Sequence, residues 1–153
     1  MPLIPTQLAS SLERNGNASS AKEGAQKFAQ AYLNYASTAV ANGIPAAPTF
    51  LQLESVLTNL LLPSFVTPGL PLVSAQAMEA ALITFWITAA PQTFAGALTA
   101  IPPPTLAAQL IAQAIVPTSN KKSATLKLAT IFDIWTRTVL ITFTPPITPS
   151  PLI

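Results

Sequence analysis

Apolar residues recur at three- and four-residue steps in five parts of the chain, which is the period of an amphipathic α-helix. The first predicted helix covers about residues 21–41. Ser20 and Glu23 have the spacing of a capping box at its start, and Gly43 is placed to close it in the left-handed conformation. Its apolar face consists of Phe28, Ala31, Tyr32, Tyr35 and Ala39.

Prolines separate the next two predicted helices. Thr49 and Gln52 repeat the capping-box spacing, and the second helix is expected to stop before Pro63. Ser74 is a favourable N-cap for a third helix, which runs over about residues 75–89. This third helix is apolar nearly all round, and that pattern predicts a central position in the core.

Two further helices are predicted toward the C-terminus. Thr105 is expected to cap a fourth helix over residues 106–115, and a fifth begins near Ser123. On the fifth, Asp133 and Arg137 are four residues apart and are expected to pair on its exposed side. Residues 138–143 then have the β-branched composition of a strand, and the pattern leaves helix and strand both open.

These elements predict an all-α fold, a bundle of about five helices with proline-rich linkers and an extended C-terminal arm. The expected organisation is a helical domain over residues 1–138 and an apolar, proline-rich arm over residues 139–153. Trp86 and Trp135, together with Phe85 and Phe132, are expected to fill the core. A chain of 153 residues is long enough to bury such a core without a disulfide or a metal.

Charge is scarce along the whole chain. Only 8% of the residues are Asp, Glu, Lys or Arg, against about 25% in an average soluble domain, whereas 50% are hydrophobic and 16 are prolines. A free monomer normally carries more charge than this. Such a neutral surface suits burial against neighbouring subunits, because charged residues are depleted in the cores of interfaces.

Residues able to carry catalysis are few. The chain has no histidine and no cysteine, which excludes the Ser-His-Asp triad, cysteine nucleophiles and the usual zinc ligands. Glu54 and Glu79 lie on different predicted helices and are the one candidate pair of facing carboxylates, although two solvated side chains are the simpler expectation. We therefore expect no enzymatic activity, no cofactor, no metal site and no small-molecule substrate.

Nucleic acid and membranes are not expected as partners either. Lys121 and Lys122 form the only adjacent basic pair, which is too little to neutralise a phosphate backbone. The longest apolar stretch, residues 80–101, is divided by Pro91 and Gln92 and has no flanking basic cluster, so a membrane span is not expected. The first residues lack the positively charged region of a signal peptide.

The C-terminal arm is the segment best suited to a partner. VLITF is a strand-like run that is able to add to the sheet edge of another chain. The proline-spaced residues after it favour polyproline II and lose little entropy on docking. The predicted assembly-arm residues are Val139, Leu140, Ile141, Phe143, Pro145, Pro146, Ile147, Pro149, Pro151, Leu152 and Ile153.

Three segments in a charge-poor, Ala/Thr/Pro-rich chain carry a resemblance: KFAQAYLNYASTAVANGIP, ALITFWI and DIWTRTVLITFTPP. In order and composition the chain resembles small helical virion structural proteins of tailed bacteriophages. The resemblance implies a non-enzymatic subunit of the neck, baseplate, tail or capsid surface, located in the virion after assembly in the host cytoplasm. It implies copies of the chain itself and neighbouring virion proteins as partners, with residues 139–153 as a lacing arm.

Two other classes of function stay open. A small membrane-active phage protein would use residues 80–101, and its solubility would depend on detergent. A soluble helical binding module would use an apolar groove for a peptide or lipid, and it would behave as a monomer with an empty hydrophobic cavity.

Overall fold

The structure, a computed structural model, describes residues 3–14, 20–41, 43–66, 71–88, 93–95, 97–114, 121–143 and 150–153. Over these residues the chain is predominantly helical, with six α-helices, a short 3₁₀ helix and five short strands. The helices are α1 (Pro5–Arg14), α2 (Ala21–Ala36), η1 (Pro48–Leu53), α3 (Glu54–Val66), α4 (Pro71–Thr88), α5 (Leu106–Ala114) and α6 (Lys121–Arg137). The strands are β1 (Val40–Ala41), β2 (Ile44–Pro45), β3 (Ala97–Ile101), β4 (Leu140–Phe143) and β5 (Ser150–Pro151).

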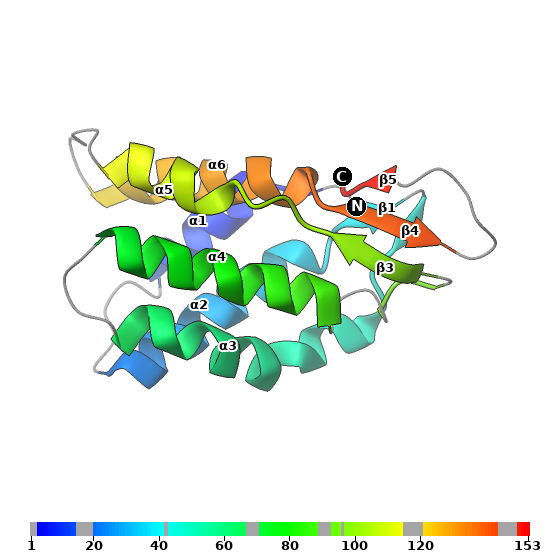
Figure 1. Cartoon of the computed structure of the whole chain (residues 1–153), viewed down its shortest axis with the longest axis horizontal. Coiled ribbons are helices and arrows are strands. Elements are labelled where there is room, and N and C mark those ends of the chain that lie inside the picture. Colours follow the sequence, from blue (N-terminus) through cyan, green and yellow to red (C-terminus); the bar gives the residue numbers. More distant parts are fainter. Residues whose placement is uncertain are drawn as a thin grey trace.

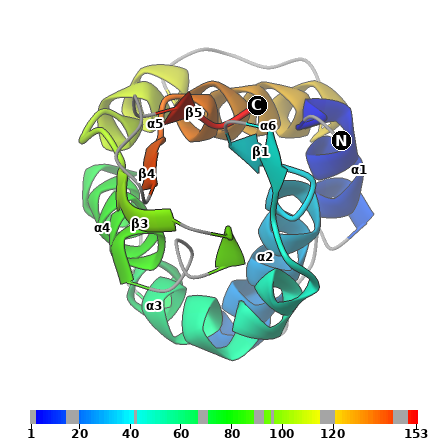
Figure 2. The same ribbon diagram turned by 90° about the vertical axis from the view of Figure 1, so that its right-hand side faces the viewer.

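The six α-helices form a closed ring (Figure 2). Each helix contacts the next one along the chain, and α6 contacts α1, which closes the circle. Buried side chains from these helices make one core. The largest fully buried side chains are Trp86, Trp135, Tyr32, Tyr35, Phe50, Phe85, Phe94 and Phe132. The expected core positions of both tryptophans, Phe85 and Phe132 are confirmed.

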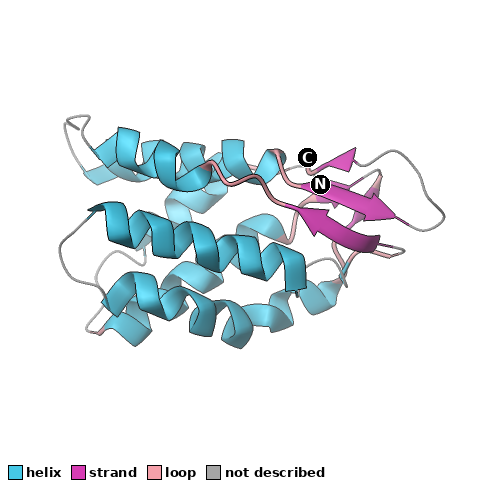
Figure 3. Ribbon diagram, in the orientation of Figure 1, coloured by secondary structure: helices cyan, strands magenta, loops and turns pink. Residues whose placement is uncertain are grey.

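The strands lie together at one end of the ring (Figures 1 and 3). Strands β1 and β2 form a hairpin whose turn contains Gly43 at φ +77°. Strands β3, β4 and β5 form an antiparallel sheet in that order. Backbone hydrogen bonds between Val40 and Ile153, in both directions, join the two sheets through β1. The prediction of a strictly all-α fold was therefore wrong in this part.

Helix α2 begins where the sequence predicted and ends earlier. The Ser20 Oγ accepts a hydrogen bond from the Glu23 N–H at 3.1 Å, as expected for the N-cap of a capping box. The helix stops at Ala36 rather than near residue 41, because Val40 and Ala41 pair with β2 and with the C-terminal residues. Gly43 keeps its predicted left-handed conformation, but in the hairpin turn rather than at the helix end.

Helices α3 and α4 also differ from the expectation. Helix α3 continues through Pro63 to Val66, and the Ser64 hydroxyl donates to the Leu61 carbonyl at 2.9 Å beside the proline. Helix α4 is not central: its Leu82, Phe85 and Trp86 are buried, while its other face, including Ile87, is exposed. The sequence of α4 is apolar with Glu79 as its single charged residue, and it misled the prediction of the helix position because this protein leaves apolar side chains such as Ile87 at its surface.

Candidate assembly surface

The described residues of the C-terminal arm pack on the chain's own body. Val139, Ile141 and Leu152 have no exposed area and belong to the same core as the helices. Strand β4 is bonded to β3 on one side and to β5 on the other, so both of its edges are occupied. The predicted addition of VLITF to another chain's sheet is thus replaced by addition to the chain's own sheet.

The structure places the other predicted arm residues as follows. Leu140 is half-buried in β4, Phe143 is the last residue of β4, and Pro151 and Ile153 are exposed beside the buried Leu152. Pro145, Pro146, Ile147 and Pro149 lie outside the described residues. The predicted boundary between residues 138 and 139 does not separate two packing units, because Trp135 and Val139 share one core.

The end of the molecule that carries the strands has an unusual composition. We call it the strand end and define it as residues 38–41, 43–47, 93–95, 97–105, 138–143 and 150–153. No Asp, Glu, Lys or Arg occurs in any of these segments. The charged residues of the chain lie instead on the helices. The strand end, which faces the viewer in Figure 2, therefore has no charged side chain.

The outer face of the three-stranded sheet is apolar or hydroxylated. Ile101 of β3 is paired with Leu140 of β4, which is paired with Pro151 of β5, so these three residues form a row across the sheet. Ile101 is 52% exposed, and Pro151 is exposed at the other end of the row. A parallel row holds Thr99 and Thr142, whose hydroxyls hydrogen-bond each other.

Strand β3 is an edge of this sheet. It has five residues, and within the described part of the chain only β4 pairs with it. Natural edge strands are usually protected by a charge, by a covering element or by being very short. The charge is absent here, and three prolines, at positions 102–104, follow directly after the strand. Within the described residues no further strand pairs with the outer side of β3, a strand that has a register irregularity between Ala97 and Thr99 and that α4 contacts.

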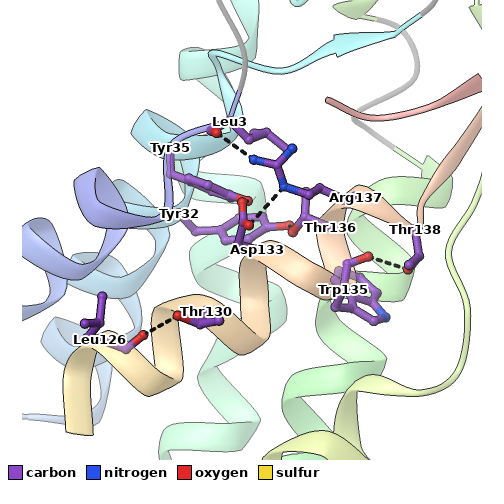
Figure 4. Close-up of polar contacts among 10 residues, drawn as sticks. All are labelled: Leu3, Tyr32, Tyr35, Leu126, Thr130, Asp133, Trp135, Thr136, Arg137 and Thr138. Atoms are coloured by element: carbon purple, nitrogen blue, oxygen red, sulfur yellow. Dashed lines mark hydrogen bonds and ion pairs between the residues drawn. The ribbon is translucent and has the colours of Figure 1, made fainter. Parts of the chain in front are cut away.

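Arg137, which directly precedes the strand end in the sequence, is held by hydrogen bonds although its side chain is 37% exposed. Arg137 closes α6, and its Nε donates to the Asp133 Oδ2 at 2.9 Å. Its Nη2 donates to the Leu3 carbonyl at 2.7 Å, which ties the N-terminal segment to α6 (Figure 4). The predicted Asp133–Arg137 pair is confirmed, but Asp133 is only 7% exposed rather than on an exposed side.

A buried polar network surrounds this pair (Figure 4). The Tyr35 hydroxyl donates to the Asp133 Oδ1 at 2.6 Å. One turn away, the Tyr32 hydroxyl accepts from the Trp86 Nε1 at 3.0 Å and bonds the Thr136 hydroxyl at 2.8 Å. Burial raises the pKa of Tyr32 to about 12, and burial together with the Asp133 hydrogen bond raises the pKa of Tyr35. These phenols are neutral structural groups at ordinary pH.

Glu79 and Glu54 also have partners in the fold. Glu79 Oε2 accepts from the Ala107 N–H at 2.6 Å and so caps the first turn of α5. Glu54 Oε1 accepts from the side-chain amides of Gln26 and Gln30. Glu54 and Glu79 therefore bond to different helices and do not form the facing pair considered from the sequence. Among the described residues, no three His, Cys, Asp or Glu side chains are grouped to hold a metal.

Sequence reasoning missed three of these features. The α1 helix was not predicted, because its apolar residues are few and lie between prolines at positions 2 and 5 and the sequence Asn15-Gly16-Asn17, which is typical of a turn. The carboxylate that caps α5 belongs to Glu79 on α4, whereas the local sequence pattern predicted Thr105 as the cap. The strand β3 lies in a stretch that the pattern assigned to a linker, and its partner β4 follows about 40 residues later.

The chain matches no protein-family model, and neither a curated protein nor a solved structure is significantly similar to it. None of the helices in the described part of the chain is long and apolar enough to cross a membrane. Within the apolar stretch 80–101, residues 80–88 continue α4 and residues 97–101 form β3.

Proposed function

We propose that this protein is a non-enzymatic structural subunit that assembles through its strand end. The observation that carries the proposal is the uncharged face with the open edge of β3. Open edge strands pair with other strands unless charge or cover prevents it. The partner proposed first is a second copy of the chain, because two β3 edges related by a two-fold axis pair antiparallel and make an isologous contact.

The proposal extends to the setting of that assembly. The resemblance to small virion proteins of tailed bacteriophages supports a place in the virion, with neighbouring virion proteins as the second class of partner. We further propose that the ring of helices acts as one rigid bundle that presents the strand end. The described part of the arm, residues 139–143 and 150–153, would then support this face from behind rather than reach across to a neighbour.

A charge on the outer face of β3 tests the proposal. Ile101→Lys places an ammonium on the edge strand, and the side chain is 52% exposed, so the fold tolerates it. The matched control is Leu126→Lys on α6, where the side chain is 46% exposed and lies away from the strands. Light scattering behind size-exclusion chromatography should give a multiple of 16.0 kDa for the wild type and the control, and 16.0 kDa for Ile101→Lys.

The two variants separate the possible outcomes. If Leu126→Lys dissociates the assembly as effectively as Ile101→Lys, the contact is not specific to the strand end. If neither variant changes the mass of an oligomeric wild type, the assembly uses another surface. Circular dichroism of both variants shows whether the helical fold is retained.

A further inference from the structure

A polar groove lies between α2 and the segment formed by η1 and α3, away from the strand end. Its main hollow has a volume of about 590 Å³ and is lined by Lys22, Gln26, Gln52, Ser55, Thr58 and Asn59, among others. A second hollow of about 260 Å³ shares Leu51 and Glu54 with the first and continues it along α2 to Asn34. Helices α2 and α3 are neighbours in the ring (Figures 1 and 2).

The polar groups of the groove are held in place before any ligand arrives. Gln26 and Gln30 both donate their side-chain N–H groups to the Glu54 Oε1, at 3.2 and 2.9 Å. The amide oxygens of both glutamines and the second oxygen of Glu54 then have no partner among the described residues. At the start of α2, Lys22 forms no ion pair within the described part of the chain. The groove thus presents fixed acceptors and one cation.

Thr58 gives a second, independent indication of a site. It lines the main hollow, its residue is only 8% exposed, and its hydroxyl is buried without a hydrogen-bond partner among the described residues. Buried hydroxyls in folded proteins nearly always have a partner, and an unpaired one therefore calls for an explanation. Because this oxygen is itself buried, a ligand in the hollow becomes its partner only when the Thr58 side chain turns toward the hollow.

The chemistry and length of the groove favour one class of ligand. Side-chain amides carry one acceptor and a pair of donors on adjacent atoms, which matches the peptide group. From Lys22 to Asn34 the groove follows α2 for about 18 Å, which is the length of roughly five or six extended residues. One lysine is too little for nucleic acid. No aromatic ring is present in the described lining to stack a sugar or a base.

We infer that this groove binds an extended, uncharged segment of polypeptide through its main chain. The single lysine and the single glutamate of the lining balance each other, which favours a segment without net charge. The groove belongs to other elements than the strand end, so this inference does not rest on the proposed assembly. A subunit with both surfaces binds one neighbouring chain at the strand end and another in the groove.

A displayed library of random ten-residue peptides tests the inference. Panning on the intact wild-type chain should enrich uncharged peptides, and the best of them should bind at least tenfold more weakly to the double variant Gln30→Ala/Asn59→Ala. The matched control Gln7→Ala/Gln76→Ala removes two amides from exposed positions on α1 and α4 and should bind as the wild type does. Both peptide-bound and free protein are followed by the backbone amide NMR signals of α2 and α3.

Several results would overturn the inference. These are no enrichment, equal binding to the groove variant, or shifts confined to the strand-end signals. Binding of maltohexaose to the groove in a parallel titration, with no peptide enriched, would reassign the site to a sugar. Peptide binding by Ile101→Lys should match the wild type, so a failure of the assembly proposal does not affect this test.

Discussion

Two threonine-to-valine substitutions, at Thr58 and Thr136, should change the free energy of unfolding in opposite directions. Thr58→Val keeps the shape and β-branching of the side chain and removes a hydroxyl that has no partner among the described residues. Thr136→Val makes the same change at a hydroxyl that bonds Tyr32 at 2.8 Å. Both residues are buried, at 8% and 0% exposure.

The expected magnitudes follow from the two environments. An unpaired buried hydroxyl costs about 1–3 kcal/mol, so Thr58→Val should raise the free energy of unfolding by about 1 kcal/mol. Thr136→Val should lower it by about 1–3 kcal/mol, because the Tyr32 hydroxyl already accepts from Trp86 and its proton then has no acceptor. Valine and threonine have similar helix propensities, so that contribution cancels.

Urea unfolding followed by tryptophan fluorescence measures both values in one experiment. The first variant should melt about 3 °C higher than the wild type and the second lower, in a domain of this size. A loss of stability in Thr58→Val comparable to that in Thr136→Val would refute the reasoning. It would show that the Thr58 hydroxyl has a partner in the free protein, and the groove would lose its second indication of a site.

Three further predictions concern the fold that carries the surface. The folded state keeps Tyr32 and Tyr35 neutral above pH 10, whereas both ionise there in the unfolded chain. For these two groups the free energy of unfolding is therefore constant below pH 10 and should fall above it by about 1.4 kcal/mol per pH unit for each tyrosine. Urea unfolding from pH 8 to pH 11 measures this slope, which Tyr32→Phe should reduce. Glu79→Gln should cost about 1 kcal/mol and speed amide exchange in α5 more than in α3, whereas uniform exchange would contradict its capping role. Removal of residues 150–153 should destabilise the monomer, because Leu152 is fully buried, and a truncated chain that unfolds at the wild-type urea concentration would show that the segment is a dispensable arm.

Local sequence predicted the starts of two helices correctly. Ser20 caps α2 as expected, and Leu106 begins α5, whereas α4 begins at Pro71 rather than after the predicted cap Ser74. These starts depend on a few neighbouring residues, which the sequence displays directly. The helix ends were predicted less well: α2 ends five residues early because β1 pairs with residues more than 100 positions away. Such a partner leaves no trace in a local pattern.

The sequence indicated which C-terminal residues to consider, but it did not predict which strands form the candidate surface. Low charge and the apolar C-terminus drew attention to residues 139–153, and the described part of this segment contains strands β4 and β5. Local preference could not say that β3 supplies the partner of β4, since the residues of β3 lie among prolines and read as a linker. The polar groove was not predicted at all, because Gln26 and Glu54 come together only when α2 packs on α3.

The most direct test of the central claim is the mass of the unmodified chain in solution over a range of concentrations. Light scattering behind size-exclusion chromatography should show a defined multiple of 16.0 kDa that dissociates on dilution, and Ile101→Lys should shift the whole curve to higher concentration. A wild type that stays at 16.0 kDa up to millimolar concentration, with Ile101→Lys indistinguishable from it, would contradict assembly through the strand end.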